Sequence, residues 1–249
     1  MSRTSEAGLR SGPALKPQAP RPANPVTSKR RGLPGWLQPL LFVLALLPLA
    51  RLFVLGFADA LGANPVEFVT RSTGTWALVM LCITLSITPL RRLSGWNALV
   101  RLRRMFGLFA FFYACLHFAV FVWLEHWFDL MAMLTDVFER PFVTVGFLAL
   151  LLMLPLAATS NQAMIRRLGR NWQVLHRLVY VIAPMAILHF WWHKAGKNDF
   201  VEPTIYGLIV TVLLLTRLLP IGRSSARPAR HSGASEPAGP TQSPTVPDR

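Results

Sequence analysis

The chain has few charged residues for its length. Only 15% of its 249 residues are Asp, Glu, Lys or Arg, whereas soluble domains carry about 25%. Long apolar runs account for the deficit, since 53% of the residues are hydrophobic and the mean hydropathy is +0.41. This composition excludes an ordinary soluble domain and indicates a protein of the lipid bilayer.

Cysteines and cofactor motifs are also scarce. The two cysteines, Cys82 and Cys115, both lie in apolar runs, with no CxxC or CxxCH pattern. Covalent attachment of a c-type heme and a thiolate metal site are therefore not expected. The sequence also lacks a G-x-G-x-x-G, a Walker loop and an H-E-x-x-H motif. We expect no nicotinamide or flavin dehydrogenase domain, so an electron-transfer function would need a separate donor.

Acidic residues are outnumbered by basic ones. There are 11 Asp and Glu against 26 Lys and Arg, which gives a net charge of +15. Such an excess can signal a nucleic-acid partner. Here the basic residues form short clusters between apolar runs, where the positive-inside rule places them. We therefore interpret the charge as membrane topology, with lipid and not nucleic acid as the surroundings.

Six apolar segments are each close to the ~20 residues that cross a ~30 Å hydrocarbon core. They cover residues 36–57, 73–90, 106–127, 142–158, 172–192 and 204–219. We predict an all-α integral membrane protein with a six-transmembrane-helix bundle over residues 36–220. Pro-rich, polar segments at 1–35 and 221–249 are expected to be disordered tails. No internal repeat is recognised in the sequence.

The basic clusters alternate with acidic loops along the chain. Lys and Arg gather in the N-terminal tail, at 91–104, at 166–170 and at 223–230, whereas the loops around 59–67 and 125–139 carry Asp and Glu. The positive-inside rule then predicts that both termini are cytoplasmic and that the acidic loops face outward. An even number of spans agrees with this orientation.

Three histidines fall within the predicted spans, where ionisable residues are costly and mark functional hypotheses. His117 lies about 18 Å along the third span, His189 lies toward the outer end of the fifth span, and His176 lies near its cytoplasmic end. Neutral imidazole is a common axial ligand of heme iron, so His117 and His189 could bind one heme between two helices. A lone membrane histidine can also simply hydrogen-bond a neighbouring helix.

Helical spacing supports this site only in part. Arg103 precedes His117 by 14 residues, which places both on nearly one face. His176 and His189 are 13 residues apart, about 140° on an ideal helix, although Pro184 between them can kink and re-phase the helix. The spacing alone therefore does not place His176 and His189 on one face.

Two further histidines are expected near the outer surface. His126 lies on the helix face opposite His117, and His193 shares the face of His189. Three functional classes stay open: a heme electron carrier, a proton-coupled transporter that uses the histidines as a relay, and a scaffold. The spans contain no paired Asp or Glu and no inverted repeat, which disfavours the transporter.

Several stretches resemble one family of membrane proteins. They are RRMFGL at 103–108 with FYACLH at 112–117, ITPLR at 87–91, TSNQAM at 159–164, LGRNWQVLHRLVY at 168–180, and the segment 184–191. These stretches are similar to the heme-binding membrane subunits of the periplasmic protein-methionine-sulfoxide reductase system, the MsrQ/YedZ family. In looser form the pattern resembles ferric reductases and NADPH oxidases, which implies a ferric reductase-like bundle.

The resemblance implies a heme b cofactor, with FMN also associated, in a bacterial inner membrane. Electrons would come from the quinone pool or a separate flavin reductase and pass to a periplasmic molybdopterin-containing subunit that reduces methionine sulfoxide in oxidised envelope proteins. It also implies that His117 and His189 are the principal heme ligands and His176 a further one. Arg103 stands where the wider superfamily has a second histidine, which leaves one heme or two.

Overall fold

The regular secondary structure is entirely helical in residues 32–218, the part of the chain that the computed structural model describes. Five helical segments are long and apolar enough to cross a membrane: Leu37–Phe57, Pro65–Ser94, Asn97–Glu125, Pro141–Ala158 and Arg170–Ala195. The all-helical prediction is confirmed for these residues. The final helix α9 (Val201–Leu218) is 18 residues long and is not among the five. Residues 1–31 and 219–249, which hold nearly all of the predicted tails, lie outside the described residues.

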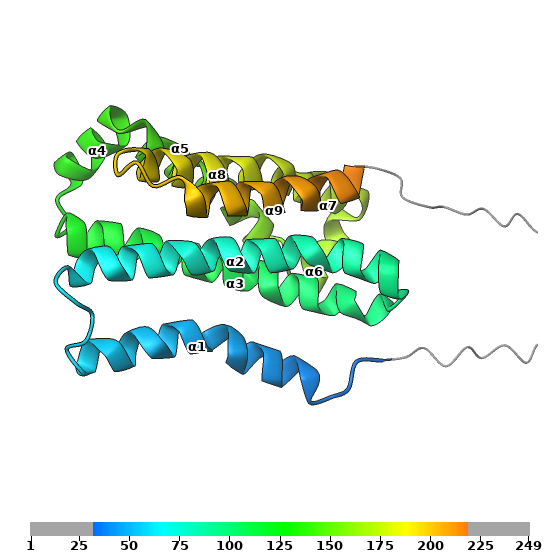
Figure 1. Cartoon of the computed structure of the whole chain (residues 1–249). Helices are drawn as coiled ribbons and strands as arrows, with labels where there is room; N and C mark the ends of the chain where they lie inside the picture. The colour runs from blue at the N-terminus through cyan, green and yellow to red at the C-terminus, as the bar shows by residue number, and fades with distance from the viewer. Residues whose placement is uncertain (1–31, 219–249) are drawn as a thin grey trace, which may run out of the picture. The chain divides into compact units, whose positions relative to one another are not determined.

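Four long helices surround the centre of the bundle. Helix α2 (Pro65–Ser94) packs along α3 (Val100–Val120), and α5 (Pro141–Ala158) packs along α8 (Val179–Ala195). Helix α3 also contacts α5, while α9 packs on both α2 and α8 (Figure 1). Helix α1 (Leu37–Phe57) contacts α3 and α2. Two helical hairpins, α2–α3 and α5–α8, therefore meet face to face.

The ends of α2 follow from its sequence. Asn64 caps the N-terminus, since its side chain accepts a hydrogen bond from the backbone N–H of Glu67 at 3.2 Å, and Pro65 occupies the first turn. The helix ends at Gly95, which adopts a left-handed conformation with φ of 67° that glycine tolerates at little cost. These signals fix both ends of a 30-residue helix that carries one face of the central site.

Pro89 creates a local defect in α2 that α9 repairs. Proline has no N–H, so the carbonyl of Leu85 loses its partner within the helix. The guanidinium of Arg217 in α9 donates to this carbonyl at 2.8 and 3.2 Å and to the carbonyl of Thr84 at 3.1 Å. Arg92 in α2 in turn donates to the carbonyl of Thr216 at 2.6 Å. Helices α2 and α9 are therefore joined at the turn of α2 that Pro89 interrupts.

The structure contains helices that the hydropathy pattern did not predict. Two short helices, α4 (Leu130–Glu139) and α6 (Gln162–Leu168), lie in segments expected to be loops. Asp129 and Asn161 cap them by accepting hydrogen bonds from backbone N–H groups. Polar capping residues give little signal in a hydropathy scan, which explains why both helices were missed.

Two of the predicted spans are irregular. The third continues beyond α3 as a π-helical segment, η2 (Phe121–Glu125). The fifth is divided into α7 (Arg170–Leu175), a 3-10 turn η3 (His176–Leu178) and α8. Both irregular segments adjoin histidines singled out by the sequence, and they change which side chains share a helix face.

Candidate functional site

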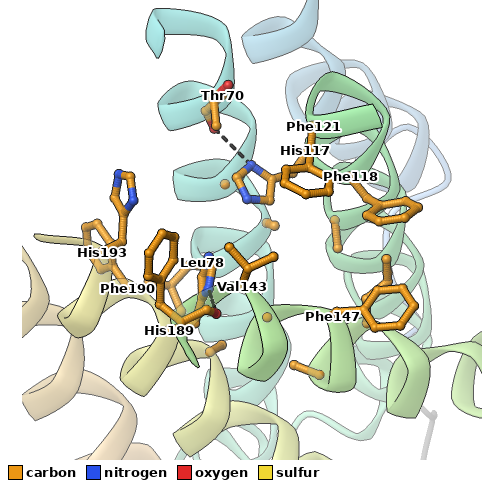
Figure 2. A pocket seen from close by; sticks show the side chains of 18 of the residues that line it. Thr70, Leu78, His117, Phe118, Phe121, Val143, Phe147, His189, Phe190 and His193 are labelled. Carbon is orange, nitrogen blue, oxygen red and sulfur yellow. Dashed lines mark hydrogen bonds between the residues drawn. The ribbon is translucent and has the colours of Figure 1, made fainter. Parts of the chain in front are cut away.

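His117 and His189 face each other at the centre of the bundle. His117 extends from α3 and His189 from α8, and their ring centres are 6.0 Å apart with an angle of 78° between the ring planes (Figure 2). Both rings line a cavity of about 280 Å³ that is bounded mainly by α2, α3, α5 and α8. The structure therefore brings together the two histidines that the sequence placed at similar depth on different helices.

Each of the two rings is held by a backbone carbonyl. The Nδ1 of His117 lies 3.0 Å from the carbonyl oxygen of Thr70, and the Nδ1 of His189 lies 2.7 Å from that of Phe142 (Figure 2). A carbonyl oxygen can only accept, so Nδ1 donates in both cases and Nε2 of the neutral imidazole keeps its lone pair. Metal-binding histidines characteristically have their second nitrogen fixed in this way.

Two glycines make room for the rings. A Cβ atom at Gly74 would lie 3.1 Å from Cε1 of His117, and one at Gly146 would lie 2.7 Å from Nδ1 of His189. The second distance is shorter than real Cβ contacts, so any other residue at position 146 would displace the ring. Each glycine lies one helical turn beyond the carbonyl that holds the same ring.

The two halves of the cavity correspond through a constant offset in the sequence. A shift of 72 positions relates Thr70 to Phe142, Gly74 to Gly146, and His117 to His189. Each histidine lies 47 residues beyond the residue whose carbonyl accepts its hydrogen bond. All residues that line the cavity fall into pairs with this offset, except Glu125, Val137, Arg140 and Glu202. The expectation of no internal repeat is therefore wrong for the cavity. Six of the twelve pairs are identical residues, but they are scattered singly or in twos along the helices and form no continuous motif.

The separation of the two rings suits a single metal atom between them. With metal–nitrogen bonds of about 2.0–2.1 Å, two imidazoles on opposite sides of one metal have nitrogens about 4 Å apart. A ring-centre distance of 6.0 Å allows this. The described residues contain no cluster of three or more His, Cys, Asp or Glu side chains that could hold a metal ion. A heme needs only the two axial ligands, because its own ring supplies the others.

The wall of the cavity is largely apolar, and its charges are few. Phe118, Phe147 and Phe190 are among the aromatic side chains that line it (Figure 2). The four charged residues in the lining are Arg71, Glu125, Arg140 and Glu202. An apolar wall with a small number of charged groups suits a flat, mostly apolar ligand that carries carboxylates.

His176 and Arg103 are not part of this cavity. The Nδ1 of His176 donates to the carbonyl of Trp172 at 3.0 Å, and its ring lies 3.9 Å from the ring of Trp172, centre to centre. The charge of Arg103 acts on His176 and on Arg217. The 3-10 turn η3 begins at His176 and alters the phase of the helix before α8. The four predicted site residues thus form one facing pair, His117 and His189, and a separate basic group.

The remaining two histidines of the described chain differ from each other. His126 lies outside the cavity lining, where Nδ1 donates to the carbonyl of Phe121 and Nε2 lies 3.1 Å from Asp136 in α4. His193 lines the cavity and its ring centre lies 5.7 Å from that of Phe142. Sequence reasoning had placed both at the outer surface and did not include His193 in the site.

Sequence reasoning also missed the residues that orient the rings of His117 and His189. Gly74 and Gly146 were not singled out, nor were Thr70 and Phe142, whose carbonyls hold the rings. A signal for them existed, since each glycine precedes its histidine by the same 43 positions. Equal Gly-to-His spacing in two hairpins would have indicated the contacts.

Comparisons with known proteins agree on one family. Residues 73–187 match the family described as "Ferric reductase like transmembrane component". A relative from Herminiimonas arsenicoxydans is 62% identical over 183 residues, which cover 73% of this chain and 84% of the relative. A relative from Bordetella parapertussis is 61% identical over 193 residues, covering 78% and 92%. One from Xanthomonas campestris pv. campestris is 51% identical over 189 residues, covering 74% and 83%. All three are named protein-methionine-sulfoxide reductase heme-binding subunit MsrQ.

Proposed function

Because this chain belongs to the MsrQ family of protein-methionine-sulfoxide reductase heme-binding subunits, we propose that it binds heme b between His117 and His189 and carries electrons across a bacterial inner membrane. The family resemblance drawn from the sequence is confirmed by these relatives. The observation that carries the proposal is the facing pair of imidazoles, 6.0 Å apart, whose Nδ1 atoms are both committed to backbone carbonyls.

The residues of the cavity fit such a group. His117 and His189 would supply the axial nitrogens, and the apolar wall would cover the ring. Arg71 and Arg140 are the basic side chains in the lining, and guanidinium groups suit the carboxylates that a b-type heme carries. When bound, heme supplies reversible one-electron chemistry. The protein supplies ligand orientation and exclusion of water.

We also assign the electron donor and the electron acceptor of the chain. The electron donor is membrane quinol or a separate flavin reductase, with FMN as an associated cofactor. The acceptor is a periplasmic molybdopterin-containing methionine-sulfoxide reductase subunit that repairs oxidised periplasmic proteins. Membership of a family named as the heme-binding subunit of that reductase supports the acceptor, whereas the donor and FMN follow from the family resemblance of the sequence. The chain is then the electron-transfer subunit and not the catalytic one.

We assign six spans to the chain, with α9 as the sixth, and both termini to the cytoplasm. The distribution of Arg and Lys supports this orientation. Under it, Asp59, Glu125 and Asp136 lie toward the periplasm. Reporter fusions at the N-terminus, within 91–104, within 166–170 and at the C-terminus should all report a cytoplasmic location. A periplasmic signal from the C-terminal fusion would exclude the six-span arrangement.

A histidine relay in a transporter is less well supported. A relay needs imidazoles that exchange protons with other titratable groups or water. His117 and His189 each use Nδ1 to donate to a backbone carbonyl, which does not release or accept a proton. The geometry therefore favours fixed ligands over proton carriers.

Absorption spectroscopy of variants tests the proposal. The purified chain should be red, with a reducible band typical of a b-type cytochrome. His117→Ala or His189→Ala should abolish or strongly deplete heme while membrane insertion persists. His176→Ala is the matched control, since His176 also donates to a backbone carbonyl but lies outside the cavity. Normal heme content in both ligand variants would refute the site.

The heme-to-protein ratio decides between one heme and two. We assign a single heme to the His117–His189 site. A ratio of two would place the second heme at His176, on the side where the charge of Arg103 acts. In that case His176→Ala should remove one spectral component and leave the other unchanged.

A further inference from the structure

The two facing histidines differ in what lies behind their acceptor carbonyls. His117 donates to the carbonyl of Thr70. The hydroxyl of Thr70 has two acceptors at 2.9 Å that share its one proton, Oε1 of Glu125 and the carbonyl of Val66 in its own helix. At the corresponding position 72 residues later, the carbonyl belongs to Phe142, whose side chain has no hydrogen-bonding group. The correspondence between the two hairpins therefore breaks at this position, and the His117 side alone is linked to a carboxylate.

The π-helical segment η2 brings Glu125 to this place. Glu125 follows His117 by eight residues, which would leave them about 80° apart around a regular α-helix. The wider i→i+5 turns of η2, over Phe121–Glu125, rotate less per residue and return Glu125 toward the face of His117. Glu125 therefore both lines the cavity and reaches Thr70 across the α2–α3 contact.

The charge of Glu125 has no ionic partner among the described residues. The other carboxylates near the cavity mouth are paired, since Glu202 lies within 4 Å of both Lys194 and Arg71, and Glu67 pairs with Lys197. The only side-chain partner that Glu125 has in this part of the chain is the Thr70 hydroxyl. Within the described chain, no ionic partner therefore offsets this carboxylate beside the site.

We propose that Glu125 is a positioning residue for His117 that acts through Thr70 and lowers the reduction potential of the site. The hydrogen bond holds the turn of α2 that presents the Thr70 carbonyl to Nδ1. An acceptor strengthened by a nearby negative charge makes the imidazole a more basic ligand. Reduction adds one electron, which a more basic ligand disfavours. The inference rests on heme binding by His117 and His189.

A redox titration of the purified full-length chain tests this inference. Glu125→Gln keeps a hydrogen-bond acceptor but removes the charge, so the midpoint potential should become more positive. At the wild-type midpoint, the ratio of reduced to oxidised heme should rise several-fold while heme content stays unchanged. Glu125→Asp, which keeps the charge, should stay close to the wild type. Glu139→Gln is the matched control, because Glu139 is exposed like Glu125 but lies outside the cavity lining.

A double variant separates the path through Thr70 from a direct effect of charge. Thr70→Val keeps the shape of the side chain and removes the hydroxyl, and it should also raise the potential. In the Thr70→Val background, Glu125→Gln should add little. An unchanged potential in Glu125→Gln, or an equal effect in both backgrounds, would overturn the inference. A wild-type chain without heme would instead defeat the proposed function.

Discussion

Replacing Gly146 by alanine should displace the ring of His189, a proposed heme ligand, without altering the chemistry of that ring. The added Cβ would lie 2.7 Å from Nδ1 and 2.8 Å from Cε1 of His189, whereas ordinary contact begins at 3.4 Å. The ring must therefore move by about 0.7 Å, and its hydrogen bond to the Phe142 carbonyl opposes that movement. Overpacking of this kind costs about 1–3 kcal/mol.

The cost of this overpacking can be expressed as a loss of heme affinity. If the cost falls on the bound state, Gly146→Ala should weaken heme binding about 5- to 150-fold, since 1.4 kcal/mol corresponds to tenfold. Alanine is the better helix former, so the loss cannot come from the stability of α5 itself. Heme content after purification and heme titration of the apoprotein measure the effect.

Two other glycines in the bundle provide a graded series. A Cβ at Gly74 would lie 3.1 Å from the His117 ring, so Gly74→Ala should weaken heme binding less than Gly146→Ala. A Cβ at Gly107 would meet Thr84 at 3.6 Å, an ordinary contact, so Gly107→Ala should bind heme normally. Equal heme content in all three variants would refute the assignment of these glycines to the ligand rings.

Three further predictions concern the parts around the site. Arg217→Met leaves the Leu85 carbonyl unsatisfied and should cost about 1–3 kcal/mol of unfolding free energy, measured by thermal unfolding in detergent. In a Pro89→Ala background, which restores the missing N–H, the same substitution should cost less. The hydrogen bond from the Lys194 ammonium holds the pKa of Asp199 below its ordinary value, so the pair stabilises the fold above about pH 4 and this contribution is lost as the pH falls through the lowered pKa. Asp199→Asn should accordingly remove part of the acid-induced drop in melting temperature, and an unchanged acid profile would contradict this. His126→Ala should leave the heme spectrum intact while residues 126–140 become more sensitive to proteolysis, because the contact to α4 is lost.

Helix existence could be predicted from the sequence because apolar runs of membrane length dominate it. The cost of histidine in lipid singled out His117, His176 and His189, and the structure brings His117 and His189 together. The fourteen-residue spacing of Arg103 and His117 suggested one shared face, yet the structure places Arg103 with His176 and Arg217. Side-chain rotation about a helix is a weak guide to which group a long arginine reaches.

The contacts that orient the ligands could not be predicted in the same way. They depend on backbone carbonyls of Thr70 and Phe142, and every residue has such a carbonyl. The wider turns of η2 also changed the phase beyond His117, which no periodicity argument includes. Hydropathy therefore located the helices. The hydrogen bonds around the two histidines depend on backbone carbonyls and on helix irregularities, which hydropathy does not report.

The hydrogen bonds from Arg217 to α2 have a consequence for the order of folding. The carbonyls of Thr84 and Leu85 receive their donor from a residue more than 130 positions later. During synthesis, α2 enters the bilayer long before that arginine exists, and unpaired backbone groups are costly in lipid. The Leu85 carbonyl therefore gains this donor only after more than 130 further residues have been made, and α9 completes the hydrogen bonding of α2.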